Sequence, residues 1–377
     1  MIKLLTDIVL ILTGFQLLLL TLVLFLQTHG RKFTRNFLIA FLVTKTVLIL
    51  RWFVFRFDIL SYHDFIYIYH ISKSAFFLLA PFLFLYVRSL CYQDFRLHKS
   101  HLLHAVPFFF MIIFLFISVT MNLQASGAEA KFWHRVFVIH SGKIFWSLNL
   151  MQILGYIVAM LRTVYVYQKR IKNIYSSVER INLVWLVSLL ILITAHWLFV
   201  VSRAAFTVLN FSPGNLIDMI DLYSISIFLV FTTTLVLKGI AQLKIFAGIA
   251  EKPKYAVSKL TETEIQNYLD QLNYYMKSAK PYLTPSLTID DLAAKLSIPS
   301  WHLSQVINDT YHQNFFNYVN SFRIEEVKQQ LKNSTAERRT ILEILYEAGF
   351  NSKSTFNNVF KKQTGLTPSE YKRMNPH

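Results

Sequence analysis

Long apolar stretches dominate the first 240 positions of the chain, and shorter amphipathic stretches follow them. Seven of the apolar stretches reach about 20 residues, the length that crosses the hydrocarbon core of a bilayer as a helix. The pattern therefore predicts seven membrane-spanning helices joined by short polar loops. We place these helices at residues 4–26, 37–57, 65–90, 102–121, 136–160, 183–206 and 216–237.

After residue 237 the pattern changes to short helices with caps and breaks. Thr288 and Thr340 each precede a helix start and are followed three residues later by an acidic residue, which is typical of a capping box. Two helix pairs result, at 289–310 and 340–364, and a longer helix at 315–332 joins them. Two helix-turn-helix units joined by one helix form a single small all-α domain. We expect a membrane domain at 1–240, a juxtamembrane linker and helix at 241–280, and the helical domain at 281–377.

Composition agrees with a chain that is mostly embedded in lipid. Hydrophobic residues make up 54% and charged residues 16%, whereas soluble proteins carry about 25% charged residues. The net charge of +17 is distributed unevenly, because 24 Lys and Arg face 9 Asp and Glu in residues 1–258, against 14 and 12 in residues 259–377. We therefore interpret the basic excess as a signal of membrane topology. The single cysteine, Cys91, excludes a disulfide framework and a Cys-rich zinc site.

The basic residues between the predicted spans give an orientation. Loops one, three and five hold eleven of them, whereas loops two, four and six hold only Lys131 and Arg135. Basic loops stay in the cytoplasm, so we expect a multi-pass protein of the cell (inner) membrane with its N-terminus outside and its C-terminal domain in the cytoplasm. The eleven are Arg31, Lys32, Arg35, Arg88, Arg96, Lys99, Arg162, Lys169, Arg170, Lys172 and Arg180.

Several ionisable side chains fall inside the predicted spans, where burial in lipid is costly. One interpretation is an outward-facing basic pocket for an anionic or lipid-like ligand. The other is that the acidic residues neutralise neighbouring arginines while the remaining cations reach toward the headgroups. Lys45 lies nearer the middle of its span than the others. The candidate pocket residues are Arg51, Arg56, Lys73, Lys143, Arg203, Asp218 and Asp221.

Three histidines, His98, His101 and His104, recur every third residue at the start of the fourth predicted span. Such a spacing can place two imidazoles on one helical face as metal ligands. No carboxylate or cysteine stands beside them in the sequence, and they fall at the predicted headgroup boundary. We therefore favour an interfacial role for them and expect neither a metal nor a cofactor.

The order and spacing of residues 287–373 resemble the DNA-binding domain of the AraC/XylS family of bacterial transcription regulators. Four positions depart from the family pattern: Ser297 and His312 replace turn glycines, Pro299 occupies a cap position, and Leu345 replaces a small residue. The arrangement of the whole chain resembles the membrane-embedded branch of that family. The resemblance rests on 287–288, 292–293, 303–304, the Arg-Ile-Glu-Glu run at 323–326, 349–350, Ser354, Phe356, Phe360, Lys361, Lys362, Gly365 and 367–371.

The resemblance implies which residues meet DNA. The second helix of each unit would enter a major groove with its early residues facing base edges. Glutamine and asparagine pair with adenine, lysine pairs with guanine, and lysines on the backbone fix the register. The implied base contacts are Trp301, His302 and Gln305 in the first unit and Lys353, Ser354, Asn357 and Asn358 in the second, and the implied phosphate contacts are Lys361, Lys362 and Lys372.

These patterns favour a membrane-tethered transcription regulator that is not an enzyme and that passes a membrane or external signal through residues 238–280 to DNA. Its implied partners are double-stranded DNA, the lipid bilayer, an anionic ligand or a membrane protein, RNA polymerase, and a second copy of the chain on repeated sites. A membrane transporter or enzyme with an accessory helical protein-binding domain is the alternative. A third hypothesis makes the helical domain a protein-binding module whose DNA contacts are degenerate.

Overall fold

In the computed structural model the chain divides into two compact units. The first consists of Met1–Tyr165 and Leu183–Glu251, and the second of Val166–Asn182 and Lys252–His377. Every regular element in the described residues is a helix, apart from two isolated β-bridges, so the predicted all-α fold is confirmed for them. The structure describes residues 1–26, 31–60, 65–124, 140–179, 181–209, 214–245, 249, 260–332 and 339–374.

The first unit is built from the apolar helices that the sequence predicts. Within the described residues, seven helical segments are long and apolar enough to cross a bilayer. The third predicted span consists of two helices that meet at Ala75, and residues 136–139 of the fifth lie outside the described residues. The elements are α1 (Ile2–Leu26), α2 (Lys32–Arg56), α3 (Ile66–Ser74), α4 (Phe76–Cys91), η1 (Lys99–Ala105), α5 (Val106–Gln124), α7 (His140–Ile174), α8 (Val184–Val208) and α9 (Asn215–Ile245).

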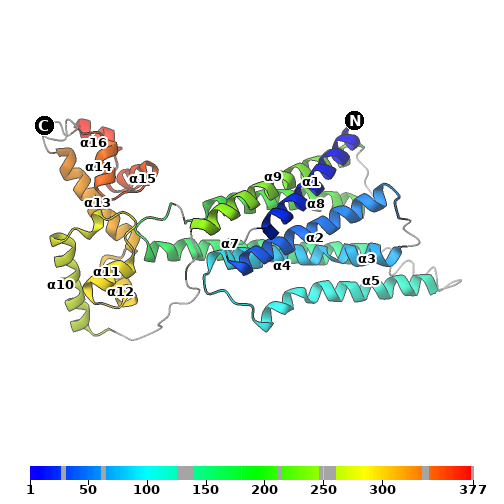
Figure 1. Cartoon of the computed structure of the whole chain (residues 1–377), viewed down its shortest axis with the longest axis horizontal. Helices are drawn as coiled ribbons and strands as arrows, with labels where there is room; N and C mark the ends of the chain where they lie inside the picture. The colour runs from blue at the N-terminus through cyan, green and yellow to red at the C-terminus, as the bar shows by residue number, and fades with distance from the viewer. Residues whose placement is uncertain are drawn as a thin grey trace. The chain divides into compact units, whose positions relative to one another are not determined.

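Neighbouring helices of this unit pack side by side (Figure 1). Helix α9 contacts α1 and α8, α2 contacts α1 and α4, and α3 contacts α5. Large apolar side chains still cover the outside of the helices, such as Phe15 with 67% and Met151 with 72% of its surface exposed. Apolar surface of this extent needs a covering layer, and lipid is the covering that helices of this length fit.

The second unit contains the predicted helix pairs (Figure 1). Capping boxes are present at the predicted positions Thr288 and Thr340 and also at Thr261, and each threonine hydroxyl accepts a hydrogen bond from the backbone N–H three residues later. Reciprocal bonds of this kind satisfy the free donors at a helix start. The elements are α10 (Glu262–Ser278), η3 (Pro281–Leu283), α11 (Ile289–Leu296), α12 (Ser300–Tyr311), α13 (Phe315–Lys332), α14 (Ile341–Glu347), α15 (Lys353–Thr364) and α16 (Pro368–Met374).

Helix α13 belongs to two separate hydrophobic cores. Its first half contributes Phe315 and Val319 to a core formed with α10, α11 and α12. Its second half contributes Ile324 and Val327 to a core formed with α14 and α15. Because one continuous helix enters both cores, it fixes the two helix pairs relative to each other.

The residues that replace turn glycines of the family pattern still adopt a backbone conformation typical of glycine. Ser297 and His312, which stand where turn glycines are usual, both adopt left-handed conformations with φ of 55° and 53°. Side chains other than glycine pay a conformational cost there. Pro299 is the N-cap of α12, and Leu345 is fully buried in the second core.

Candidate nucleic-acid interface

Helices α12 and α15 are the second members of the two helix pairs. Each buries one apolar face, with Leu303 and Ile307 inward on α12 and Phe356 and Phe360 inward on α15. The start of α15 is fixed by Ser352, whose hydroxyl accepts a hydrogen bond of 3.1 Å from the backbone N–H of Thr355. The buried faces decide which polar residues of these two helices face outward.

On α12, Trp301 and Gln305 are both half-buried and lie one helical turn apart. His302 differs, because only 9% of its surface is exposed. Its ring lies 3.6 Å from the ring of Trp301 and 5.8 Å from that of Tyr268, measured between centroids. His302 thus packs between the rings of Trp301 and Tyr268. Its contact with a base stays a prediction, and the burial of its side chain does not favour that contact.

On α15, Lys353, Ser354 and Asn358 are exposed, and Asn357 is half-buried. These residues occupy the first turn and a half of the helix, the part that faces base edges in helix-turn-helix proteins. One or two turns further on, Lys361 and Lys362 are also exposed. The structure therefore brings six of the implied contacts onto the outside of this single helix.

Helix α16 follows directly and carries Lys372, which is half-buried. Near it, the carboxylate of Glu370 accepts a hydrogen bond of 2.8 Å from the backbone N–H of Thr367. This hydrogen bond lowers the pKa of Glu370, and Lys361 and Arg373 lower it further. An ionised carboxylate therefore accompanies Lys361 at the end of α15.

Arg323 of α13 is the centre of a buried hydrogen-bond network that the sequence did not predict. Only 1% of its surface is exposed, and burial lowers its pKa to about 10, while Glu179 opposes the shift. Its guanidinium donates to the carbonyl oxygens of Tyr282 at 2.7 Å and Thr284 at 3.0 Å. The sequence used Arg323 only as a family marker, and its spacing of four residues from the apolar Val319 and Val327 was an available signal of burial.

The same guanidinium binds a segment that is distant in sequence. Arg323 donates to the hydroxyl of Ser176 at 3.2 Å and to its carbonyl oxygen at 3.4 Å, and Asn320 donates to that carbonyl at 3.3 Å. The backbone N–H of Ser176 donates to the carbonyl oxygen of Leu287 at 3.0 Å. Residues 174–179, which we name the docking segment, are thereby part of the second unit, although the sequence assigned them to a loop of the membrane domain.

Two further contacts hold the docking segment. Ile174 packs against the core of the first helix pair, and the side-chain amide of Asn351 donates to the hydroxyl of Ser177 at 2.9 Å. Asn351 also donates to the hydroxyl of Ser286 at 2.7 Å. The docking segment therefore touches residues before, within and after helix α13.

The candidate pocket residues in the spans contact different side chains. Arg203 pairs with Asp221 at 3.5 Å, as the neutralisation hypothesis expects. Arg51 lies over the ring of Tyr69 at 4.9 Å and Lys73 over that of Phe145 at 4.5 Å. Asp218 is half-buried in the first turn of α9, and the side chains of Arg56 and Lys143 lie outside the described residues.

The C-terminal residues are similar to known proteins. Residues 292–374 match the family described as "Helix-turn-helix domain". The right origin-binding protein of Escherichia coli (strain K12) is 32% identical over 92 residues, which are 24% of this chain and 31% of that protein. The transcriptional regulator Rob of Salmonella typhimurium has the same identity and coverage. The regulatory protein SoxS of Escherichia coli (strain K12) is 29% identical over 91 residues, which are 24% of this chain and 82% of SoxS.

No solved structure matches the chain. The chain spans about a third of the length of the origin-binding protein and of Rob, and the matched family covers residues 292–374. These residues contain α12, α13, α14, α15 and α16, with the polar outer faces of α12 and α15. The C-terminal part of this chain is therefore an AraC-type helix-turn-helix domain, the kind of domain found in DNA-binding transcription regulators.

Proposed function

We propose that the chain is a membrane-tethered, sequence-specific transcription regulator that couples a membrane or external signal to gene expression. The observation that carries this proposal is the presence, in one chain, of an AraC-type helix-turn-helix domain and seven helices apolar enough to span a bilayer. Tethering confines the domain to a thin layer at the cytoplasmic face of the membrane, so target DNA has to approach that layer.

DNA is read by α12 and α15, which enter two major-groove segments about one helical turn apart on the same face of the duplex. Trp301 and Gln305 contact bases in one segment, and His302 orients Trp301 from behind. Lys353 and Asn357 contact bases in the other, together with Ser354 and Asn358. Each well-formed pair with a base edge contributes about 1–3 kcal/mol of discrimination.

Lys361, Lys362 and Lys372 bind phosphates and fix the register of the two helices on the duplex. Each such contact releases counterions, so binding weakens with salt without changing the preferred sequence. Binding by two copies to repeated sites and contact with RNA polymerase complete this part of the proposal, which rests on the resemblance of residues 287–373 to the AraC/XylS family.

The N-terminus lies outside the cell and the C-terminal domain in the cytoplasm. The charge asymmetry of the loops supports this orientation, because eleven basic residues fall on one side and two on the other. A domain limit near residue 240 and a linker at 241–280 belong to the same proposal; residues 246–248 and 250–259 of that linker lie outside the described residues.

The signal reaches the domain through the docking segment as well as through the linker. Helix α7 runs without interruption from His140 to Ile174, and its residues from Val166 onward already belong to the second unit. Its continuation is anchored by Ser176 on Arg323 and Asn320. A shift of α7 along its axis therefore pulls directly on α13, the helix that fixes the two helix pairs.

Selection of DNA by the full-length protein tests the proposal. The protein is reconstituted in nanodiscs, incubated with random double-stranded DNA and washed, and the retained DNA is sequenced. We expect a motif with two half-sites, and we expect Gln305→Ala and Lys353→Ala each to weaken binding to that motif about tenfold or more. Lys295→Ala is the matched control, because Lys295 is exposed on α11, the first helix of its pair, and should leave affinity unchanged.

The outcomes separate the competing hypotheses. A folded protein that selects no motif would contradict the regulator hypothesis. Selection that Gln305→Ala and Lys353→Ala leave intact would show that α12 and α15 do not read the bases, and the helical domain would then be a protein-binding module. Labelling of single introduced cysteines at positions 60 and 96 in a Cys91→Ser background, with a reagent that does not cross membranes, tests the orientation. Only position 60 should react from outside.

A second experiment tests the docking segment. Asn351→Ala removes the amide that binds Ser177 and Ser286 but lies on the surface, so the domain keeps its core. We expect hydrogen exchange at the backbone N–H of Ser176 to accelerate about tenfold, and reporter transcription to change accordingly. Ser321→Ala is the control, because Ser321 donates only to Tyr318 within α13. Faster exchange with unchanged transcription would exclude the docking segment as the route of the signal.

A further inference from the structure

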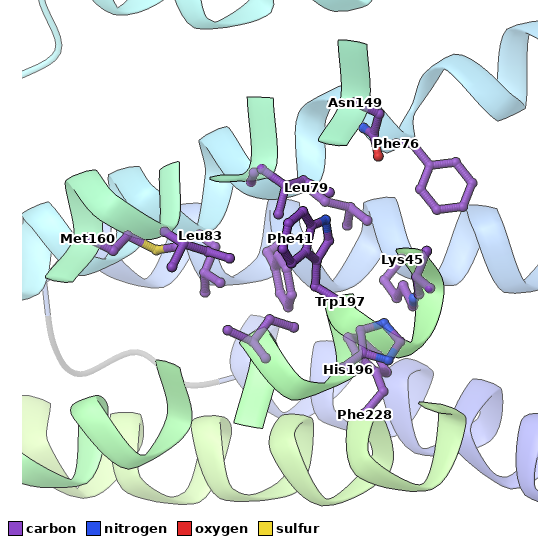
Figure 2. Close-up of a pocket in the computed structure, with 15 residues that line it drawn as sticks. Phe41, Lys45, Phe76, Leu79, Leu83, Asn149, Met160, His196, Trp197 and Phe228 are labelled. Carbon is purple, nitrogen blue, oxygen red and sulfur yellow. The ribbon is translucent and has the colours of Figure 1, made fainter. Parts of the chain in front are cut away.

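A cavity of about 90 Å³ lies inside the first unit (Figure 2). Fifteen residues line it, contributed by α2, α4, α7, α8 and α9, and none of the seven candidate pocket residues is among them. Leu79, Ile153 and Val200 in its wall remain half-exposed, so the cavity opens onto the apolar outside of the helices. No Asp or Glu is among the lining residues.

Polar groups gather in one part of the cavity. Lys45 projects into it with only 9% of its surface exposed, and its ammonium lies 4.1 Å from the ring of Phe228. Figure 2 shows Lys45, His196 and Phe228 together, Asn149 beside Phe76 at the upper edge, and Leu83 and Met160 on the opposite side of Trp197. Among the described residues no carboxylate pairs with Lys45. The contact with the ring offsets only part of the cost of burying its charge.

Two neutral donors in the same cavity are unpaired in the part of the chain that the structure describes. The side-chain Nδ2 of Asn149, a residue with 1% of its surface exposed, has no hydrogen-bond acceptor, and neither has the indole N–H of Trp197. His196 uses its Nδ1 on Ser224, with the carbonyl oxygen and the hydroxyl each at 2.9 Å. Buried donors without acceptors are rare in proteins. One ammonium and two N–H groups line this space, and a ligand that supplies acceptor oxygens would satisfy them.

The rest of the cavity is apolar. Leu83 and Ile157 line it together with Met160, the lining residue on α7 farthest from Asn149. Asn149 and Met160 are separated by about 16 Å along α7, because each helical residue rises about 1.5 Å. A ligand with an anionic head at Lys45 can therefore place its first methylene groups along this wall and pass the remainder through the opening into lipid.

We propose that this cavity binds an anionic amphiphile, with its head oxygens on Lys45, Asn149 and Trp197 and a hydrocarbon chain directed toward Met160. A free fatty-acid carboxylate and the phosphate of a membrane phospholipid share this chemistry. The role of the amphiphile as the signal rests on the proposed regulator function, whereas binding itself does not.

Equilibrium binding of radiolabelled decanoate to the full-length protein in phosphatidylcholine nanodiscs tests the proposal. We expect saturable binding that decanol, which has the same chain without the charge, competes at least tenfold more weakly. Lys45→Gln should reduce affinity about tenfold or more. Lys3→Gln is the control, since Lys3 also lies in an apolar helix but does not line the cavity, and it should bind decanoate like the unaltered protein.

Trp197→Phe is the second variant, because it keeps the aromatic ring and removes only the N–H; we expect about threefold weaker binding. Nanodiscs that contain phosphatidylglycerol distinguish the two sources of the ligand. Competition by this lipid assigns the site to a phospholipid head, and undiminished decanoate binding assigns it to a free fatty acid. Non-saturable binding, equal competition by decanol, or unchanged affinity in Lys45→Gln would overturn the proposal.

Measurement of DNA binding in the same preparations keeps the two proposals separate. Decanoate binding without DNA binding would leave the cavity assigned and contradict the regulator function. DNA binding without saturable decanoate binding would contradict the proposed ligand of the cavity and leave the regulator function in place. An unchanged rate of hydrogen exchange in the helices of the first unit shows that Lys45→Gln has folded.

Discussion

Gly349 lies in the turn between α14 and α15, and its replacement by alanine tests how tightly the second helix pair packs on the rest of its unit. Its φ is +86°, in the left-handed region, and a Cβ added there would lie 2.7 Å from the carbonyl oxygen of Tyr282 and 2.8 Å from that of Leu283. The first of these carbonyls is held by Arg323 at 2.7 Å. It therefore cannot move away without weakening that buried hydrogen bond.

Two contributions set the size of the effect. The left-handed conformation costs an alanine about 1–2 kcal/mol. Overlap with fixed backbone atoms adds about 1–3 kcal/mol, the range for overpacked sites. Gly365→Ala is the matched control, because Gly365 also has a positive φ, +76°, but a Cβ there has no neighbour within 4 Å. We expect Gly349→Ala to destabilise α15 by about 2 kcal/mol more than Gly365→Ala does.

Hydrogen exchange measured by mass spectrometry on the full-length protein in detergent provides the assay. Peptides that contain Phe356 and Phe360 report the opening of the second core. A difference of about 2 kcal/mol corresponds to about thirtyfold faster exchange in Gly349→Ala than in Gly365→Ala. Exchange rates in the two variants that agree within about twofold would show that the contact between the turn and Tyr282 does not constrain the domain, and the reasoning would be wrong.

Three further predictions concern the same domain. His312→Gly should stabilise it by about 1 kcal/mol, because the left-handed conformation then carries no side-chain cost; thermal unfolding of the purified protein measures this, and an unchanged or lower transition temperature would contradict it. Glu343→Gln should destabilise α14 at neutral pH, since hydrogen bonds from Thr340 lower the pKa of Glu343 below its usual 4.5. The ionised carboxylate therefore stabilises α14 above pH 4.5, and this stabilisation is lost as the pH falls through the lowered pKa of the folded state. Hydrogen exchange in α14 should differ between Glu343→Gln and the unaltered protein at pH 7 and become equal in acid. Lys361→Gln should lower affinity equally for all DNA sequences and reduce the slope of log affinity against log salt by about 1, whereas Gln305→Ala should relax the preference at one base position; a sequence-dependent loss in Lys361→Gln would exclude a phosphate contact.

Local elements could be predicted from the order of residues alone. Hydropathy alone located the seven apolar helices, because each must bury its backbone polar groups within its own segment to enter lipid. The helix starts at Thr288 and Thr340 followed from partners three residues apart, which lie close together in any helix that begins there. The outward faces of α12 and α15 followed in the same way from the spacing of their buried residues.

Contacts between distant residues were decided only by the tertiary structure. His302 precedes the buried Leu303 on α12, and its burial depends on Tyr268 of another helix. Ser176 and Arg323 meet although the sequence places Ser176 in a loop between two apolar helices. The cavity around Lys45 requires five helices at once, and the sequence had placed its candidate pocket on other residues.

The physical reason is the range of the interactions. Helix propensity, capping and the transfer of a segment into lipid depend on neighbours within about one helical turn or on the composition of one segment, and both can be evaluated from the sequence. The partner of a buried arginine or lysine depends on which helices pack together, because many arrangements of the same helices satisfy the local rules equally well. Lys45 is an isolated cation in an apolar stretch and Arg323 stands beside glutamates on an amphipathic helix. Only the packed structure shows that Arg323 is satisfied by carbonyl groups while Lys45 faces a cavity.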